Sequence, residues 1–286
     1  MKDWILAARL RTLPAAIAPV LIGCAIAWDG GHFHILAASM AMLGAILIQI
    51  GTNFANDYFD FINGADTEER IGPTRATQAG LITPTAMKWA FILTFSLIVP
   101  IIAYLTFRGG WPMIVLGALS IVSGILYTGG PKPLGYMGLG DIFVLIFFGP
   151  VAVAGTEYVQ SLSISTDAII AGLGSGLIST AILVVNNLRD KDTDIKVGKN
   201  TLAVRFGATF VRIEYTLCIL FAAGVALYFA VTHGTWMVLP ALATMVAIPI
   251  IRSMWTQEGA ALDPNLGKTA KILILYSSTF CIGWLL

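Results

Sequence analysis

The chain has 286 residues, of which 57% are hydrophobic and only 12% are charged. The charged fraction is about half that of an average soluble domain, so the composition argues against a water-soluble fold. The net charge of +1, with no basic run outside the expected loops, gives no sign of nucleic-acid binding. Cys24, Cys218 and Cys281 lie far apart in apolar stretches, which excludes a disulfide framework or a cysteine metal site.

Nine apolar stretches are long enough to cross a hydrocarbon core of about 30 Å as helices. We expect these helices at residues 12–28, 36–56, 86–107, 111–128, 140–159, 168–187, 209–231, 235–252 and 268–286. Residues 25–27 also fit a signal-peptide cleavage site, but Arg9 and Arg11 favour an uncleaved first helix. The sequence therefore predicts an all-α integral membrane protein, with residues 1–286 forming a single polytopic domain.

The basic residues indicate how these helices are oriented. With nine alternating crossings, sixteen of the 17 Lys and Arg residues fall on one side and only Arg108 falls on the other. Cytoplasmic loops carry the excess of Lys and Arg, so this side is the cytoplasm and the N-terminus lies there. We expect a bacterial cytoplasmic (inner) membrane.

Two acidic clusters end the second and the sixth expected helix on the cytoplasmic side. The first is N-F-A-N-D-Y-F-D-F-I-N-G-A-D, residues 53–66, and the second is N-N-L-R-D-K-D-T-D-I-K-V-G-K-N, residues 186–200. The two helices are parallel and four helices apart, which predicts two four-helix pseudo-repeats followed by a ninth helix.

Each cluster places its polar residues on one helical face. The spacing is i, i+4, i+7 in the first and i, i+4, i+8 in the second, for Asn53, Asp57 and Asp60, and for Asn186, Asp190 and Asp194. Stacked carboxylates repel each other, and helix C-termini disfavour negative charge. Mg²⁺ relieves both penalties, since it takes oxygen ligands from carboxylates together with substrate phosphate oxygens. Merely solvated charged loops would instead scatter their acids.

Basic residues close to the clusters are suited to bind a phosphate group. These are Arg75 after the first cluster, and Lys196, Lys199 and Arg205 in or after the second. A third loop, residues 127–141, presents Lys132 between two prolines, where a rigid backbone could direct it towards an anion or simply form a stiff turn. We also expect Arg11, Asn53 and Tyr127 to contact substrate.

The paired motifs N-D-Y-F-D-F-I-N-G-A-D and R-D-K-D-T-D-I-K-V-G resemble those of the intramembrane aromatic prenyltransferases. R-L-R-T-L-P-A-A-I-A-P-V-L-I-G, I-G-P-T-R-A-T-Q-A-G-L-I-T-P and N-N-L-R-D are similar to the 1,4-dihydroxy-2-naphthoate branch of that family. The family pattern is N-D-x-x-D-x-x-x-D, whereas this chain has Gly64 at the last position and Asp66 two residues later. The role of Asp66 is therefore open.

The resemblance implies a nine-helix bundle around a central cavity, capped by cytoplasmic loops. It implies transfer of a polyprenyl group from polyprenyl diphosphate to 1,4-dihydroxy-2-naphthoate, with loss of CO₂ and diphosphate, giving a demethylmenaquinone. Two Mg²⁺ ions, with Mn²⁺ as a substitute, would be held by Asn56, Asp57, Asp60, Asp66, Asn186, Asp190 and Asp194. The four aspartates Asp57, Asp60, Asp190 and Asp194 would be the catalytic residues.

Two alternatives stay open at this point. The same transfer could use 4-hydroxybenzoate or another aromatic acceptor, because one fold can host several acceptors. An ion-coupled transporter would also place acids inside a membrane protein, but transporter sites lie near the bilayer midplane, whereas these acids gather at one face. The acceptor carboxylate needs a paired cation, for which Lys132 and Arg75 are the candidates.

Overall fold

A computed structural model describes residues 1–65 and 71–286, and Asp66 lies outside the described residues. The secondary structure of this described part is entirely helical. The longer helices are α2 (Leu13–Asp29), α3 (Ile35–Ile62), α4 (Pro84–Ser96), α5 (Ile98–Gly109), α6 (Pro112–Leu126), α8 (Pro150–Ser161), α9 (Thr166–Lys196), α10 (Leu202–Thr232) and α13 (Asp263–Leu285). The shorter ones are α1 (Lys2–Ala8), α7 (Gly140–Phe147), α11 (Val238–Thr244) and α12 (Ile248–Thr256). The 3₁₀ turns are η1 (Leu10–Thr12), η2 (Gly135–Met137), η3 (Thr235–Met237), η4 (Met245–Ala247) and η5 (Gly259–Leu262).

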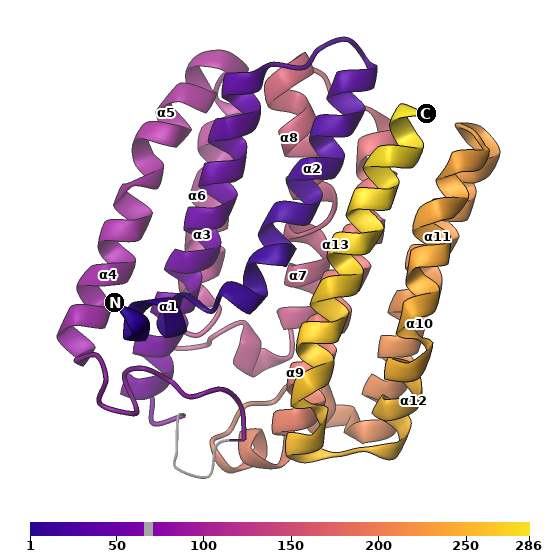
Figure 1. Ribbon diagram of the computed structural model, residues 1–286. Coiled ribbons are helices and arrows are strands. Elements are labelled where there is room, and N and C mark those ends of the chain that lie inside the picture. The colour runs from indigo at the N-terminus through magenta and orange to yellow at the C-terminus, as the bar shows by residue number, and fades with distance from the viewer. Residues whose placement is uncertain (66–70) are drawn as a thin grey trace.

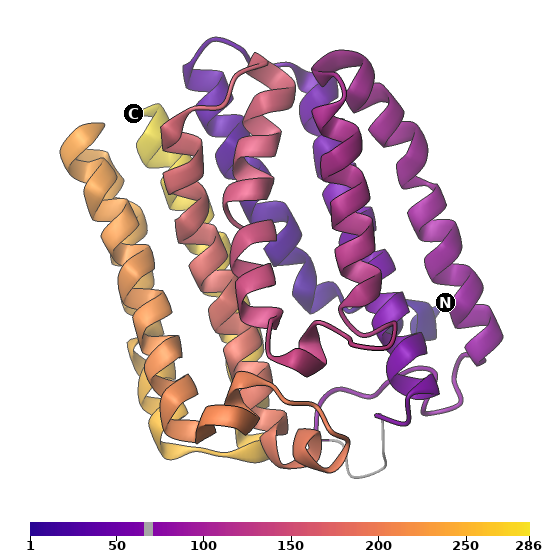
Figure 2. The ribbon, with the colours of Figure 1, turned by 180° about the vertical axis from the view of Figure 1, so that it is seen from behind.

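The long helices run roughly parallel and form a bundle whose two ends carry the connecting loops (Figures 1 and 2). One core cluster packs α2 and α8 to α13 together and includes the fully buried Ile22, Ile178, Tyr215 and Phe280. A second, smaller cluster joins α1, α3 and α4 around Phe54.

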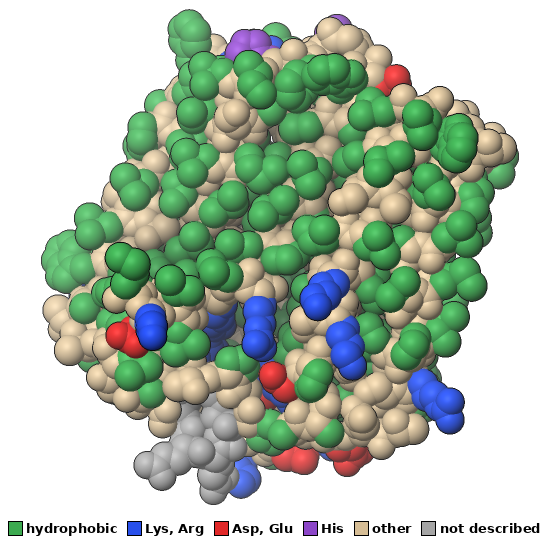
Figure 3. Space-filling view, viewed as in Figure 1, with side chains coloured by type: hydrophobic (Ala, Val, Ile, Leu, Met, Phe, Trp, Pro, Cys, Tyr) green, Lys and Arg blue, Asp and Glu red, His purple; other side chains and the backbone are tan. Residues whose placement is uncertain are grey.

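On the face shown in Figure 3, hydrophobic side chains dominate the surface between the two ends, whereas most of the visible Lys, Arg, Asp and Glu gather towards the end that carries the motif loops. Seven helical segments of the described chain are long and apolar enough to cross a membrane by length and composition, with mean hydropathy from 1.7 to 2.2. Pro112–Leu126 is a shorter apolar helix. This is the surface of an integral membrane protein, as the composition predicts.

Three of the expected spans are broken in the structure, at 86–107, 140–159 and 235–252, and a proline stands at or just after each break. The span at 86–107 divides into α4 and α5 at Leu97, because Pro100 has no N–H to donate to the carbonyl of Ser96. The span at 140–159 divides into α7 and α8 at Gly149, directly before Pro150. The span at 235–252 divides into η3, α11, η4 and α12, and Pro249 lies in the first turn of α12. A continuous helix was the wrong expectation for these three segments, although each is still long and apolar enough to cross a membrane as one span.

The break at Gly149 also sets how closely α7 and α8 approach α9. A Cβ atom at Gly149 would lie 2.8 Å from the carbonyl oxygen of Gly172 and 3.0 Å from Cα of Gly176. Only glycine permits contacts this short, because any side chain at Gly149 would push its backbone away from that of α9. The three glycines therefore hold the broken helix against the helix that carries the second motif.

Candidate active site

The first motif occupies the last turns of α3. The helix ends at Asn63, its C-cap, and Gly64 follows with φ 66°, a conformation that favours glycine. Gly64, which stands where the resembled pattern has its last aspartate, therefore lies at the point where the chain leaves the helix. Asp57 and Asp60 are both 1% exposed, so the motif is buried beneath the loops.

The two aspartates of the first motif have different surroundings. The carboxylate of Asp57 accepts hydrogen bonds from the backbone N–H groups of Ala76 and Thr77, at 3.1 and 2.9 Å. Asp57 thereby fastens the loop that brings Arg75 back to α3. Asp60 instead faces a polar pocket, and its Oδ2 accepts from Nη2 of Arg75 at 2.8 Å.

The second motif lies within α9 and is organised by a fully buried arginine. Arg189, 1% exposed, donates from Nε and Nη2 to the two carboxylate oxygens of Asp190 at 2.8 and 2.7 Å. It also donates to Asn186 Oδ1 at 2.7 Å and to Asp263 Oδ1, in the first turn of α13, at 2.8 Å. This bidentate contact fixes the plane of the Asp190 carboxylate. Arg189 was not predicted as a site residue, although it stands inside the N-N-L-R-D motif.

The end of α9 turns Lys199 back towards the first motif. Gly198 has φ 72°, and the backbone N–H of Lys199 donates to the carbonyl of Asp194 at 2.9 Å. Nζ of Lys199 then lies 3.1 Å from Oδ1 of Asp60 and 4.8 Å from the ring centroid of Tyr136. The hydroxyl of Tyr136 donates to the same Asp60 oxygen at 2.8 Å. Tyr136 comes from the 127–141 loop and was not predicted as a site residue.

The N-terminal segment closes another wall of the site. Arg9 joins α1 to η1 with φ 49°, and this turn directs Arg9 into the polar pocket while Arg11 remains exposed. Asn53 holds the turn by donating from Nδ2 to Ala8 O and Thr12 Oγ1, both at 2.9 Å. Arg11 was the predicted contact, because a left-handed residue between two short helices cannot be recognised from helical periodicity.

The polar pocket has a volume of about 230 Å³ and lies between the two motifs. Acidic, amide and basic side chains from both motifs and from the loops line it: Arg9, Asn56, Asp60, Arg75, Tyr127, Tyr136, Asn186, Asn187, Asp190, Asp194 and Lys199. The structure thus brings the two motifs together at one end of the bundle, as their spacing predicts.

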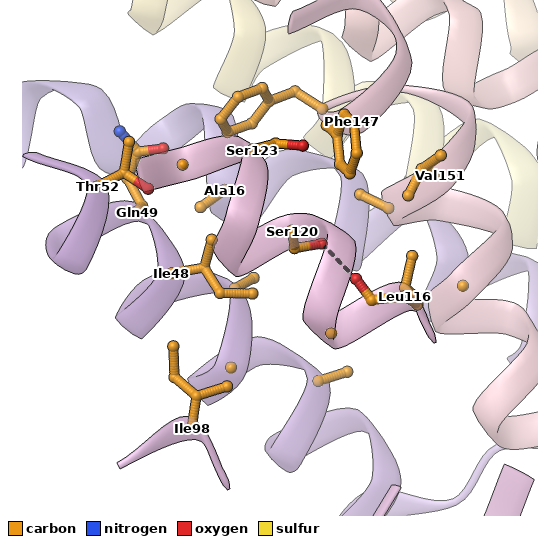
Figure 4. Close-up of a pocket in the computed structure, with 18 of the residues that line it drawn as sticks. Ala16, Ile48, Gln49, Thr52, Ile98, Leu116, Ser120, Ser123, Phe147 and Val151 are labelled. Carbon is orange, nitrogen blue, oxygen red and sulfur yellow. Dashed lines mark hydrogen bonds between the residues drawn. The ribbon is translucent and has the colours of Figure 1, made fainter. Parts of the chain in front are cut away.

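An apolar pocket of about 300 Å³ adjoins the polar one, and Figure 4 shows residues that line it. It runs between α2, α3, α5, α6, α7 and α8, from Asn56 in the first motif to Met113 and Val159 at the far end. The two pockets have five lining residues in common: Gln49, Asn56, Tyr127, Val144 and Phe148. A ligand with a charged head and an apolar tail could therefore occupy both.

Several expected contacts lie outside this arrangement. Lys132, Lys196 and Arg205 are exposed and line neither of the two pockets. Arg205 instead lies beside Gly138, at the loop that follows η2. Of the cations expected to bind substrate, Arg75 and Lys199 reach the polar pocket.

The donor set around the polar pocket suits a hard divalent cation. Asp60, Asp190, Asp194 and Asn56 offer only oxygen atoms as ligands, and each is at most 9% exposed. Within residues 1–65 and 71–286, no group of three or more His, Cys, Asp or Glu side chains is close enough to enclose a metal ion. A few dispersed oxygen ligands of this kind fit Mg²⁺, which binds one or two carboxylates and completes its coordination shell with water and phosphate oxygens.

Residues 16–273 match the UbiA prenyltransferase family, and the chain belongs to that family. A curated 1,4-dihydroxy-2-naphthoate octaprenyltransferase from Haemophilus influenzae is 39% identical over 100% of this chain and 96% of that protein. The protein of the same name from Escherichia coli is 39% identical over 99% of this chain and 94% of its own length. The expected family is confirmed.

Solved structures share the fold at low sequence identity. An apo UbiA homologue from Aeropyrum pernix superposes with a TM-score of 0.71 at 14% identity, covering 95% of this chain and 96% of that one. A UbiA homologue from Archaeoglobus fulgidus, bound to GPP and Mg²⁺, has a TM-score of 0.70 at 15% identity, covering 99% of this chain and 100% of that one. The all-helical bundle of this chain is therefore the UbiA fold.

Proposed function

We propose that this chain transfers a polyprenyl group from polyprenyl diphosphate to 1,4-dihydroxy-2-naphthoate, releasing diphosphate and CO₂. The product has the demethylmenaquinone skeleton. The observation that carries the proposal is the continuity of a polar pocket, lined by both motifs, with an apolar pocket between six helices. The names of relatives that are 39% identical along the whole chain support this acceptor.

Divalent metal binding is part of the proposal. Asp60 and Asn56 would hold one Mg²⁺ ion, and Asp190 and Asp194 a second, with Mn²⁺ as a substitute. The ions supply electrostatic stabilisation of the departing diphosphate. Asp57 supports the site indirectly, through the loop that carries Arg75. The UbiA homologue bound to GPP and Mg²⁺ supports the use of Mg²⁺ in this fold.

The chain's own residues would then direct the reaction. Lys199 binds diphosphate oxygens as the bond between the first prenyl carbon and the diphosphate oxygen breaks. Tyr127, Phe143, Phe147 and Phe148 line the apolar pocket and offer aromatic faces that stabilise the allylic cation. The surrounding apolar side chains exclude water, which would otherwise capture the cation. The electron-rich ring carbon that bears the carboxylate attacks the cation, and the electrons of its C–CO₂ bond return to the ring as CO₂ leaves.

The acceptor carboxylate needs a cation inside the site. Arg75 lines the polar pocket and is 7% exposed, whereas Lys132 is exposed on the 127–141 loop. We therefore place the carboxylate near Arg75 rather than Lys132. Arg9 is a second cation in the same pocket.

The membrane arrangement follows from the charges. The chain would cross a bacterial inner membrane nine times, with the N-terminus and both motif loops on the cytoplasmic side. This arrangement places Lys and Arg according to the positive-inside rule. The helices that carry the motifs, α3 and α9, then run in the same direction. Two four-helix repeats followed by α13 account for that relation.

Acceptor competition tests this function. Purified protein receives octaprenyl diphosphate, Mg²⁺ and equal concentrations of 1,4-dihydroxy-2-naphthoate and 4-hydroxybenzoate, and products are identified by mass. We expect the naphthoate product to dominate. Faster prenylation of 4-hydroxybenzoate would refute the acceptor assignment while leaving the diphosphate site in place, and no product from either acceptor would refute the function.

A further inference from the structure

Asp60 is surrounded by more positive charge than a buried carboxylate needs. Arg75 binds its Oδ2 at 2.8 Å, while Lys199 and the Tyr136 hydroxyl bind its Oδ1 at 3.1 and 2.8 Å. These three groups come from three separate segments: the loop after α3, the loop after α9 and the loop after α6. Two cations and one hydroxyl thus satisfy a carboxylate that is 1% exposed.

This arrangement conflicts with metal binding at the same oxygen. A divalent ion bound to Oδ1 of Asp60 would lie within a few ångströms of the Lys199 ammonium group, and like charges at that distance in a buried site repel strongly. One of the two must leave. Diphosphate arrives with negative oxygens that accept the displaced ammonium group.

We propose that Lys199 is an exchangeable counter-ion of Asp60. Without metal it neutralises the buried carboxylate, and when a divalent ion and diphosphate bind it transfers from Asp60 to the diphosphate. The inference rests on the metal and diphosphate site of the proposed function and assigns Lys199 two successive partners. Lys199 would then compete with the metal ion for Asp60 and would bind the diphosphate group of the prenyl donor.

The local structure favours Lys199 over Arg75 for this exchange. Lys199 follows Gly198, carries its charge on a flexible stem and has a side chain that is 15% exposed. Arg75 is held at 8% side-chain exposure on a loop that Asp57 fastens through two backbone bonds. Lys199 is therefore the cation that can move.

Tyr136 is the positioning residue for this lysine. Its ring lies 4.8 Å from Nζ of Lys199, and its backbone carbonyl accepts from the N–H of Asn200 at 2.9 Å. The ring contact does not depend on Asp60, so it can keep the ammonium group beside the pocket before and after the exchange. Tyr136→Phe retains the ring and removes only the hydroxyl donor.

Two binding measurements of opposite expected sign test the proposal. Full-length protein in detergent is titrated with Mn²⁺ alone, and separately with inorganic diphosphate at saturating Mg²⁺, by calorimetry. For Lys199→Gln we expect the Mn²⁺ Kd to fall about tenfold, because the competing charge is gone, and the diphosphate Kd to rise about tenfold or more. Lys191→Gln, in the same motif but paired with the exposed Asp192, should change each by less than about twofold.

A purely structural role for Lys199 predicts a different pattern. Weaker Mn²⁺ binding by Lys199→Gln, an unchanged Mn²⁺ Kd, or no Mn²⁺ binding by wild type and variant alike would overturn the exchange. Tyr136→Phe is the second variant, expected to tighten Mn²⁺ binding less than Lys199→Gln does. A wild type that binds Mn²⁺ and diphosphate but prenylates neither aromatic acceptor would contradict the proposed function without affecting this inference.

Discussion

The guanidinium group of Arg75 and the carboxylate of Asp60 form a buried ion pair, with 2.8 Å between Nη2 and Oδ2. The pair connects the last turn of α3 to the loop fifteen residues later and forms part of the polar pocket. The pair is possible because Asp57, one turn earlier, binds the backbone of residues 76 and 77. One aspartate of the motif therefore fastens the loop, and the other faces the polar pocket.

Removing one member of this pair should destabilise the protein. Arg75→Met leaves Asp60 buried with Lys199 as its remaining cation, and breaking a buried ion pair typically costs about 3–5 kcal/mol. We expect a lower Tm in detergent for Arg75→Met and for Asp60→Asn. The double variant should be less destabilised than the sum of the two, as for any directly coupled pair. Lys132→Met is the control, and an equal loss of stability there would contradict this account.

Turnover should depend on the acids that face the polar pocket. We expect Asp60→Asn and Asp194→Ala to lower kcat at least about a thousandfold. Each substitution removes a carboxylate that would hold Mg²⁺ beside the departing diphosphate. EDTA should stop turnover, and Mg²⁺ or Mn²⁺ should restore it. Asp192→Asn is the matched control, because Asp192 is exposed and pairs with Lys191. Substantial activity in EDTA would refute the metal assignment.

The apolar pocket should select the prenyl tail. Ser120 on α6 lines it, whereas Leu119 on the same helix is 53% exposed on the outer surface. Ser120→Phe fills space in the pocket, so we expect kcat/KM for octaprenyl diphosphate to fall at least about tenfold more than for geranyl diphosphate. Leu119→Phe should leave that ratio unchanged. Equal losses for both donors with Ser120→Phe would show that the tail lies elsewhere.

The orientation in the membrane can be measured with single cysteines. In a background without Cys24, Cys218 and Cys281, we expect Asp192→Cys to react with a membrane-impermeant thiol reagent only from the cytoplasmic side. Ser163→Cys, in the exposed turn between α8 and α9 at the opposite end, should react only from the outside. Labelling of both positions from one side would contradict the topology.

Much of this architecture follows from sequence patterns that are local. Hydrophobic stretches predict the helices, and helical spacing predicts that Asp60, Asp190 and Asp194 line one site, because each lies inside a regular helix. Residues that follow glycine or proline turns could not be placed in the same way. Arg9 enters the pocket instead of Arg11 because of one left-handed residue, and Tyr136 reaches Asp60 through a loop with no periodicity. The breaks between α4 and α5 and between α7 and α8 leave backbone groups without a partner in their own helix. Neighbouring helices and side chains must supply new hydrogen-bond partners, and local sequence patterns do not show these.

The acceptor chemistry can be followed directly with 1,4-dihydroxy-2-naphthoate that carries ¹⁴C in its carboxyl group. Purified protein with octaprenyl diphosphate and Mg²⁺ should release labelled CO₂ in a one-to-one ratio with diphosphate and with an unlabelled prenylated product. Omitting Mg²⁺ should abolish all three. A prenylated product that retains the label, or diphosphate release without prenylation of the naphthoate, would contradict decarboxylative prenyl transfer by this protein.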